Sequence, residues 1–183
     1  MAADFTLLQF DFRLRVFEAI RICLNFETEV LCYCTIRTPE EQAILFRKSR
    51  TRKEIKQRIQ SMTDKGFPFF AETLSKVGPQ SGVLGKHLTN AAPGESWHQY
   101  GLACDCVPVV AGKALWNDDA IEWTIYGGAA EYTDLTWAGN WSLKSREYPH
   151  IQRYRINNPL SFYQSEELAR ASLVAKASTK GGK

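Results

Sequence analysis

The stretch of residues 102–110 constrains this chain most, because it is almost wholly apolar yet contains one carboxylate, Asp105. Its valines and small apolar residues are typical of a strand, and we expect one over residues 100–110. A carboxylate inside such a stretch costs free energy unless it is paired or binds a cation. The sequence therefore predicts a strand whose Asp105 meets a partner group or a metal ion.

Two segments ahead of this strand have clear periodicities. Residues 8–26 are amphipathic with Phe17, Ile20 and Leu24 at helical spacing, which predicts a helix buried along that face. Residues 30–36 are short, apolar and rich in strand-forming residues, and we expect them to form a buried strand.

Capping boxes predict the starts of two further helices. Thr38 precedes Glu41 by three residues, with Pro39 at the first helical position, and Thr51 precedes Glu54 in the same way. The second of these helices should end at Gly66 and present one apolar face, made of Ile55, Ile59 and Met62.

The remaining elements complete an α+β pattern. We expect a short helix in 67–80, a loop or hairpin in 81–97, a helix capped by Asn117 that runs to about 131, short strands at 135–137 and 150–154, a helix at 165–177 and a disordered end at 178–183. No repeat or interdomain linker interrupts the chain. The predicted fold is a small antiparallel sheet packed with helices, in one domain over residues 1–163 followed by a C-terminal helix and tail over 164–183.

Composition excludes several functional classes. With 183 residues, 44% of them hydrophobic and 23% charged, the chain can bury one core. Its net charge of +3 is mild for a dedicated nucleic-acid binder but compatible with a polyanionic surface such as a bacterial cell wall. Acidic residues and an arginine interrupt the apolar N-terminal stretch, and no apolar run is long enough to span a bilayer. We therefore expect no signal peptide and no membrane span, and a protein that first accumulates in the cytoplasm.

The five cysteines include two pairs with C-x-C spacing, Cys32 with Cys34 and Cys104 with Cys106. On a strand this spacing places both sulfurs on one face. Zinc ligation is one interpretation, but metal sites usually use wider spacing. We expect reduced thiols that pack as small buried side chains on neighbouring strands.

The chain has only three histidines, and two of them lie within seven residues of a carboxylate in the sequence. His98 lies seven residues before Asp105, and a turn at Gly101 could bring the two together. Glu147 lies three residues before His150, but Pro149 excludes a helix interior and indicates a loop that enters a strand. Two imidazoles and one carboxylate are a suitable set for catalytic zinc, which takes three protein ligands and leaves one position for water.

These residues form a recognisable pattern. The arrangement resembles the signature of the LAS superfamily, which includes lysostaphin-type endopeptidases, D-Ala-D-Ala metallopeptidases and the hedgehog signalling domain. Its elements are Ser96-x-His98-x-x-Gly101-x-Ala103-x-Asp105 and Glu147-x-x-His150. The nearer match is the D-alanyl-D-alanine carboxypeptidase and L-alanyl-D-glutamate endopeptidase branch, to which many phage endolysins belong. Two further stretches resemble that branch, Trp137-Ala138-Gly139-Asn140-Trp141 and Ile36-Arg37-Thr38 with Glu41-Gln42 and Leu45-Phe46.

The resemblance implies a zinc site and a catalytic base. By it, His98, Asp105 and His150 bind one Zn²⁺ per chain. Glu147 is then the general base for amide hydrolysis, standing beside the metal without binding it. The implied fold is that of the hedgehog and D,D-peptidase group.

The resemblance also implies supporting residues. Arg37 would stabilise the oxyanion of the tetrahedral intermediate, and Ser96 and Trp141 would contact substrate. His87 has no counterpart in the pattern and is expected to be a plain loop residue. Ala138 departs from the pattern, which has glycine at this position.

The function expected on this basis is hydrolysis of peptidoglycan stem peptides by an L-alanyl-D-glutamate endopeptidase that acts as a phage endolysin. A D-alanyl-D-alanine carboxypeptidase or dipeptidase is the alternative within enzymes, and a zinc-binding interaction domain without catalysis is the alternative outside them. Peptidoglycan is the expected partner, with no nucleic acid and no membrane span, and the protein is expected to be a monomer. It would reach the periplasm or cell wall on release from the cytoplasm.

Overall fold

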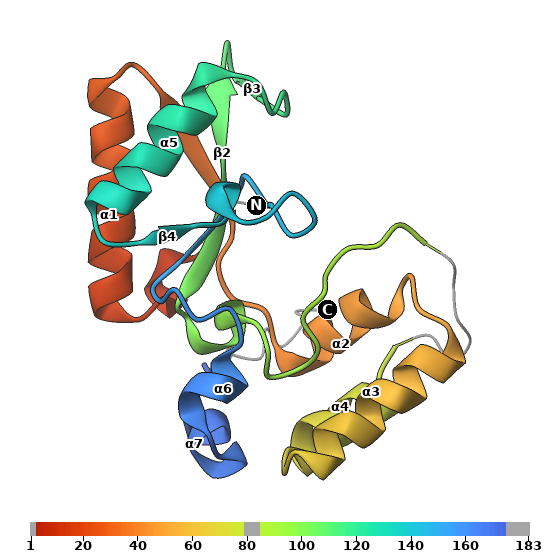
Figure 1. Cartoon of the computed structure of the whole chain (residues 1–183). Coiled ribbons are helices and arrows are strands. Elements are labelled where there is room, and N and C mark those ends of the chain that lie inside the picture. The colour runs from red at the N-terminus through yellow and green to blue at the C-terminus, as the bar shows by residue number, and fades with distance from the viewer. Residues whose placement is uncertain (1–2, 79–84, 175–183) are drawn as a thin grey trace, which may run out of the picture. The chain divides into compact units, whose positions relative to one another are not determined.

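The computed structural model describes residues 3–78 and 85–174 (Figure 1). The described residues form two compact units. The first unit comprises Met1–Ile36 and Tyr100–Arg155, and the second comprises Arg37–Gln99 and Ile156–Lys183. The predicted α+β class is confirmed, since an antiparallel sheet is packed with helices.

The sheet lies in the first unit and has the strand order β1-β2-β5-β4, with β3 paired to β2. All of its pairings are antiparallel, as the fold prediction required. Its strands are β1 (Glu29–Cys34), β2 (Ala103–Val110), β3 (Lys113–Ala114), β4 (Thr136–Trp137) and β5 (His150–Gln152). The predicted strand containing Asp105 is therefore β2, in the interior of the sheet.

Two helices of the first unit, α1 (Phe10–Asn25) and α5 (Ile121–Tyr132), pack against each other beside the sheet (Figure 1). The predicted helix over residues 8–26 is confirmed, but its predicted buried face is wrong. Phe17 and Leu24 are about half exposed, at 45% and 55%. The buried stripe has the same helical spacing in another register, and consists of Phe12, Val16, Ala19 and Cys23.

Two other predictions for this unit need correction. The strand β1 is not buried along its length, because it lies at the sheet edge and exposes Leu31 and Tyr33 while burying Cys32. Asn117 does not cap α5, whose N-cap is Ala120. The Asn117 side chain instead accepts a hydrogen bond of 3.3 Å from the backbone N–H of Asp119 within the preceding turn.

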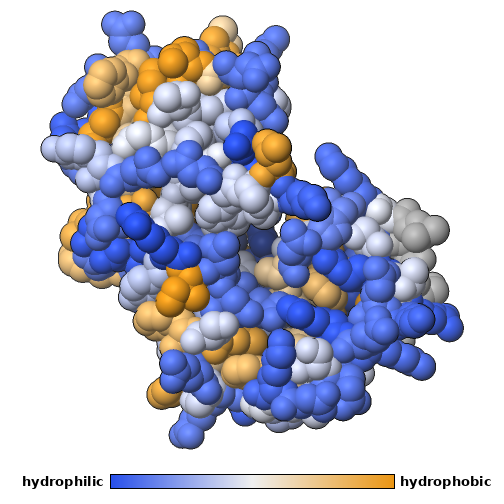
Figure 2. All heavy atoms as spheres, viewed as in Figure 1, coloured by the Kyte–Doolittle hydropathy of each residue, from blue (hydrophilic) through white to orange (hydrophobic). Residues whose placement is uncertain are grey.

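The second unit contains α2 (Pro39–Arg47), α3 (Arg52–Asp64), α4 (Pro68–Lys76), α6 (Pro159–Tyr163) and α7 (Glu166–Ala171). Both predicted capping boxes are confirmed. Thr38 accepts from the backbone N–H of Glu41 at 3.1 Å, and the Glu41 carboxylate accepts from the N–H of Thr38 at 2.8 Å. The same reciprocal pair starts α3 at Thr51 and Glu54. Over α3 the viewed surface is mostly hydrophilic (Figure 2), in keeping with the basic composition of this helix.

The C-terminal helix is shorter than predicted. It covers α7 alone rather than residues 165–177, and the predicted disorder at 178–183 lies outside the described residues. The first residues of the predicted loop at 81–97 also lie outside them, while 85–96 form neither helix nor strand. The domain boundary after residue 163 stays a prediction. No helix in the described part of the chain has the length and apolar character needed to cross a bilayer.

Candidate active site

Asp105 and His150 face each other across two paired strands. They are register partners on β2 and β5, and Asp105 Oδ1 lies 3.0 Å from His150 Nδ1. Both side chains are largely buried, with 14% and 10% of their surface exposed. The sheet thus brings together two of the three predicted metal ligands, although they are 45 residues apart in the chain.

Gln152 decides how the His150 ring is oriented. The Gln152 amide N–H donates to the carbonyl of Tyr154 at 2.6 Å, which leaves its Oε1 to face His150 Nε2 at 3.1 Å. Because that oxygen can only accept, it suits an N–H on Nε2 and leaves Nδ1 to face the Asp105 carboxylate. A metal ion between Nδ1 and the carboxylate would be bound by both groups.

The loop that precedes His150 is held by its own backbone. The Pro149 carbonyl accepts from the backbone N–H of Cys106 at 2.9 Å and from the Tyr126 hydroxyl at 3.1 Å. The Trp137 indole donates to the carbonyl of Tyr148 at 2.7 Å. These bonds fix the loop that enters β5, as Pro149 predicted, and so fix the position of the imidazole. Tyr148 and Pro149 form a turn within this loop, because the His150 N–H donates to the Glu147 carbonyl at 3.2 Å.

Three more residues of the first unit bear on the Asp105–His150 pair. The Trp141 ring centroid lies 5.5 Å from that of His150, which suits the predicted wall of a binding site. Glu147 lies in the loop with its side chain exposed, and its backbone N–H donates to Ala138 at 3.2 Å. Cys34 is the register partner of Asp105 on β1 and holds its sulfur within 4.8 Å of an Asp105 oxygen. Cys34 was not predicted as a site residue, because its pairing with Asp105 depends on the register of β1 and β2.

The second unit contains the other predicted residues. His98 lies in the short 3-10 helix η2 (Trp97–Tyr100) and is 2% exposed. Its carbonyl accepts from the Arg37 backbone N–H at 3.4 Å. The Arg37 guanidinium donates to Gln42 Oε1 at 3.0 Å, and the fully buried Gln42 amide donates to the Ala91 carbonyl at 2.7 Å. Gln42 therefore orients Arg37, a role that the sequence analysis missed although the residue lay within the quoted stretch.

Ser96 and His87 lie in the same unit. Ser96 is buried, and its carbonyl accepts from the N–H of Gln99 at the start of η2. His87 is an exposed loop residue whose ring nitrogens face Ser49 and Asn90. Asp105 and His150 belong to one unit and His98 to the other, so the convergence of all three ligands on one metal ion stays a prediction.

Comparison with known proteins bears on these same residues. A family model described as D-alanyl-D-alanine carboxypeptidase matches residues 89–153. The segment includes both motifs that carry the resemblance and the Trp137–Trp141 stretch, whereas Arg37 and Gln42 lie outside it. The resemblance to this peptidase family that the motifs predicted is thereby confirmed over residues 89–153.

One solved structure was also compared. The L-Ala D-Glu endopeptidase ChiX of Serratia marcescens is similar over 89% of this chain and 94% of that chain, with 14% sequence identity and a TM-score of 0.38. A likeness of this size carries no argument about the function of the present chain.

Asp105 and His150 fit the zinc that the matched family implies. Ligand atoms that lie 2.0–2.2 Å from a tetrahedral zinc ion are about 3.4 Å from each other. The 3.0 Å between Asp105 Oδ1 and His150 Nδ1 is close to that separation. The Gln152 oxygen completes the usual arrangement, in which a ligating histidine donates its other N–H to a fixed acceptor.

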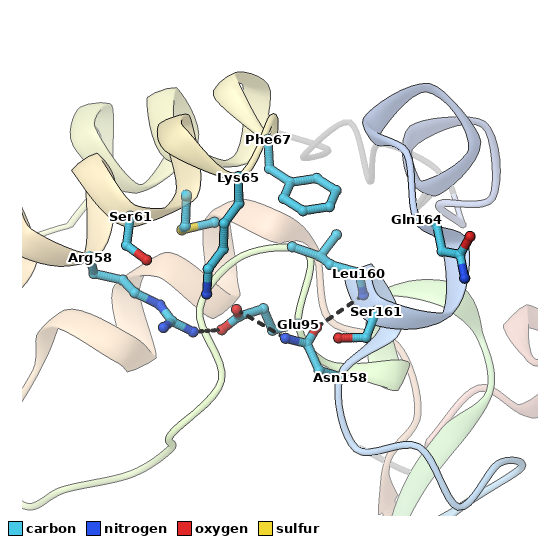
Figure 3. Close-up of a pocket in the computed structure, with 10 residues that line it drawn as sticks. Arg58, Ser61, Lys65, Phe67, Glu95, Asn158, Leu160, Ser161 and Gln164 are labelled. Carbon is cyan, nitrogen blue, oxygen red and sulfur yellow. Dashed lines mark hydrogen bonds and ion pairs between the residues drawn. The ribbon is translucent and has the colours of Figure 1, made fainter.

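A separate pocket of about 300 Å³ lies within the second unit, between α3 and α6 (Figure 3). Glu95 forms part of its lining and pairs with Arg58, while also accepting from the N–H of Ala92 at 2.9 Å and the Asn158 amide at 3.3 Å. These bonds satisfy the buried carboxylate and fix the loop immediately before Ser96. Residues of α3, among them Arg58, Ser61 and Met62, form one wall of this pocket.

Proposed function

We propose that this protein is a zinc-dependent peptidase that hydrolyses amide bonds in the stem peptides of bacterial peptidoglycan. The observation that carries the proposal is the Asp105–His150 pair, in which a carboxylate oxygen and an imidazole nitrogen lie 3.0 Å apart. A carboxylate and an imidazole that close together can bind one divalent cation. The match of residues 89–153 to a peptidase family supports the same reading of the pair.

His98 would complete the ligand set. His98 lies in the short helix η2, which ends at Tyr100. The next residue, Gly101, has a positive φ of 66° and turns the chain toward β2. Two histidines and one aspartate leave a fourth position for water on a catalytic zinc ion. When bound there, zinc supplies Lewis-acid polarisation of the substrate carbonyl and lowers the pKa of water.

Side chains of the protein supply proton transfer and oxyanion stabilisation. Glu147 accepts a proton from the attacking water and returns it to the leaving amine, and its exposed position on the loop before His150 leaves it open to both. Arg37 donates to the oxyanion that forms as the carbonyl carbon becomes tetrahedral. Gln42 holds the guanidinium for that task, and Gln152 holds the His150 ring.

The first test concerns Glu147. Glu147→Gln should lower kcat on purified cell walls about 10²–10⁴-fold, the usual range for a general base, while zinc content is unchanged. Glu29→Gln, at another exposed glutamate of the first unit, is the matched control and should keep full activity. A Glu147→Gln variant with wild-type turnover would remove Glu147 from the mechanism.

The second test identifies the bond. We propose cleavage between L-Ala and D-Glu, as in the endopeptidases that the motifs resemble. The family description favours a second candidate, a D-alanyl-D-alanine carboxypeptidase. Digested walls analysed by mass spectrometry separate the two, because the endopeptidase creates a new D-Glu amino terminus and the carboxypeptidase releases free D-Ala.

The third test addresses catalysis itself. Removal of metal with EDTA should abolish wall digestion, and added Zn²⁺ should restore it. A protein that binds zinc but digests no wall under any of these conditions would instead be an interaction domain. Lysis of Gram-negative cells with permeabilised outer membranes, compared between wild type and Glu147→Gln, tests the proposed role as an endolysin.

A further inference from the structure

Three cysteine side chains gather on one face of the sheet in the first unit. Cys32 on β1 and Cys104 and Cys106 on β2 hold their sulfurs within 4.8 Å of one another, and the Cys104 and Cys106 sulfurs are 3.9 Å apart. None of the three side chains is more than 4% exposed. No disulfide joins any of the five cysteines.

Strand geometry explains how the cluster forms. Cys104 and Cys106 are two residues apart on β2, so both point to the same face, and Cys32 is the register partner of Cys106 on β1. Asp105, between them in sequence, points to the opposite face. The cluster is therefore distinct from the Asp105–His150 pair.

The spacing of the sulfurs suits one soft metal ion. Three thiolates placed around an ion at about 2.3 Å, a typical metal–thiolate distance, lie about 4.0 Å from one another. The measured 3.9 Å between Cys104 and Cys106 already has this value. The third sulfur needs to move by less than 1 Å from the outer limit of 4.8 Å.

The number of ligands narrows the choice of metal. Structural zinc takes four ligands, but no fourth histidine, cysteine or carboxylate of the described residues joins this group. Full burial leaves no access for a water ligand. Thiolates select soft ions, and Cu(I) is the soft d¹⁰ ion that accepts three sulfur ligands.

We propose that Cys32, Cys104 and Cys106 bind one Cu(I) ion as a three-thiolate site. Each thiol loses its proton on ligation, and no oxidation or reduction takes place. The ion cross-links β1 to β2. Because β1 is an edge strand whose pairing within the sheet is with β2 alone, this cross-link stabilises the strand that also presents Cys34 to Asp105.

The test titrates the full chain, without oxygen, with a Cu(I) complex of a competing chelator. We expect one equivalent of Cu(I) to bind, with a raised melting temperature. Cys104→Ala should abolish this binding. Cys23→Ala is the matched control, since Cys23 is an equally buried cysteine on α1 outside the cluster, and it should bind like wild type.

X-ray absorption at the copper edge then reports the ligands. Three sulfur neighbours with no nitrogen or oxygen are expected. No binding by wild type, equal binding by Cys104→Ala, a shell containing nitrogen or oxygen, or preference for zinc at the cluster would each overturn the proposal. None of these readouts depends on peptidase activity, so failure of the copper-site proposal can be distinguished from failure of the proposed function.

Discussion

Replacing Gly127 by alanine should destabilise the first unit, although the same change usually stabilises a helix. Gly127 lies within α5 against the ring of Trp137, and a Cβ added there would lie 2.1 Å from a ring carbon. The ring cannot withdraw, because a Cβ at Gly139 would also approach it to 2.2 Å and its indole N–H is bonded to the Tyr148 carbonyl. Alanine at position 127 must therefore displace the indole or the helix.

The magnitude follows from three contributions. Alanine gains about 0.5–1 kcal/mol over glycine inside a helix. Overpacking a core costs about 1–3 kcal/mol, and a ring clamped on two sides belongs at the upper end. Loss of the Trp137–Tyr148 hydrogen bond costs about 1 kcal/mol more. We expect Gly127→Ala to lower the free energy of unfolding by about 2–3 kcal/mol.

The neighbouring glycine is the control. Gly128 lies in the same helix, but a Cβ there would meet nothing within 4 Å. Gly128→Ala should therefore stabilise the protein by about 0.5–1 kcal/mol. Urea unfolding followed by far-UV circular dichroism measures both variants. Equal stabilisation by the two substitutions would refute the packing argument, because helix propensity alone would then explain both.

Three further expectations concern other parts of the chain. Thr51→Ala removes the cap of α3 and should cost about 1 kcal/mol of stability, measured by thermal unfolding; an unchanged melting temperature would contradict a contribution from the capping box. Gln42→Leu removes the amide donor to the Ala91 carbonyl and the acceptor of one Arg37 guanidinium hydrogen bond, so it should cost about 1–3 kcal/mol and lower kcat more than it raises KM; unchanged kinetics would show that Arg37 needs no positioning by Gln42. Burial raises the pKa of Cys23 to about 11, so at pH 8 this thiol is protonated and should resist iodoacetamide until urea unfolds the protein; rapid alkylation of the folded protein, detected by peptide mapping, would contradict its burial.

The sequence predicted best what depends on neighbours along the chain. The starts of α2 and α3 follow from Thr38 and Thr51, whose hydroxyls bond backbone groups only three residues away. The loop before His150 follows from Pro149, because the proline ring restricts its own backbone and excludes a helix interior there. The metal-ligand motif was recognisable for a similar reason, since its residues keep fixed spacings within two short stretches.

Tertiary structure decided whatever depends on partners that are distant in sequence. Helical spacing in residues 8–26 is compatible with more than one buried face, and only packing beside the sheet selected the stripe that contains Val16. Strand order placed β1 at an edge, and strand register set Cys34 opposite Asp105. The contact between Gln152 Oε1 and the His150 ring became known only from the folded positions of the two side chains. Burial and register are long-range properties because they arise when separate segments meet, and a local sequence pattern does not specify which segments those will be.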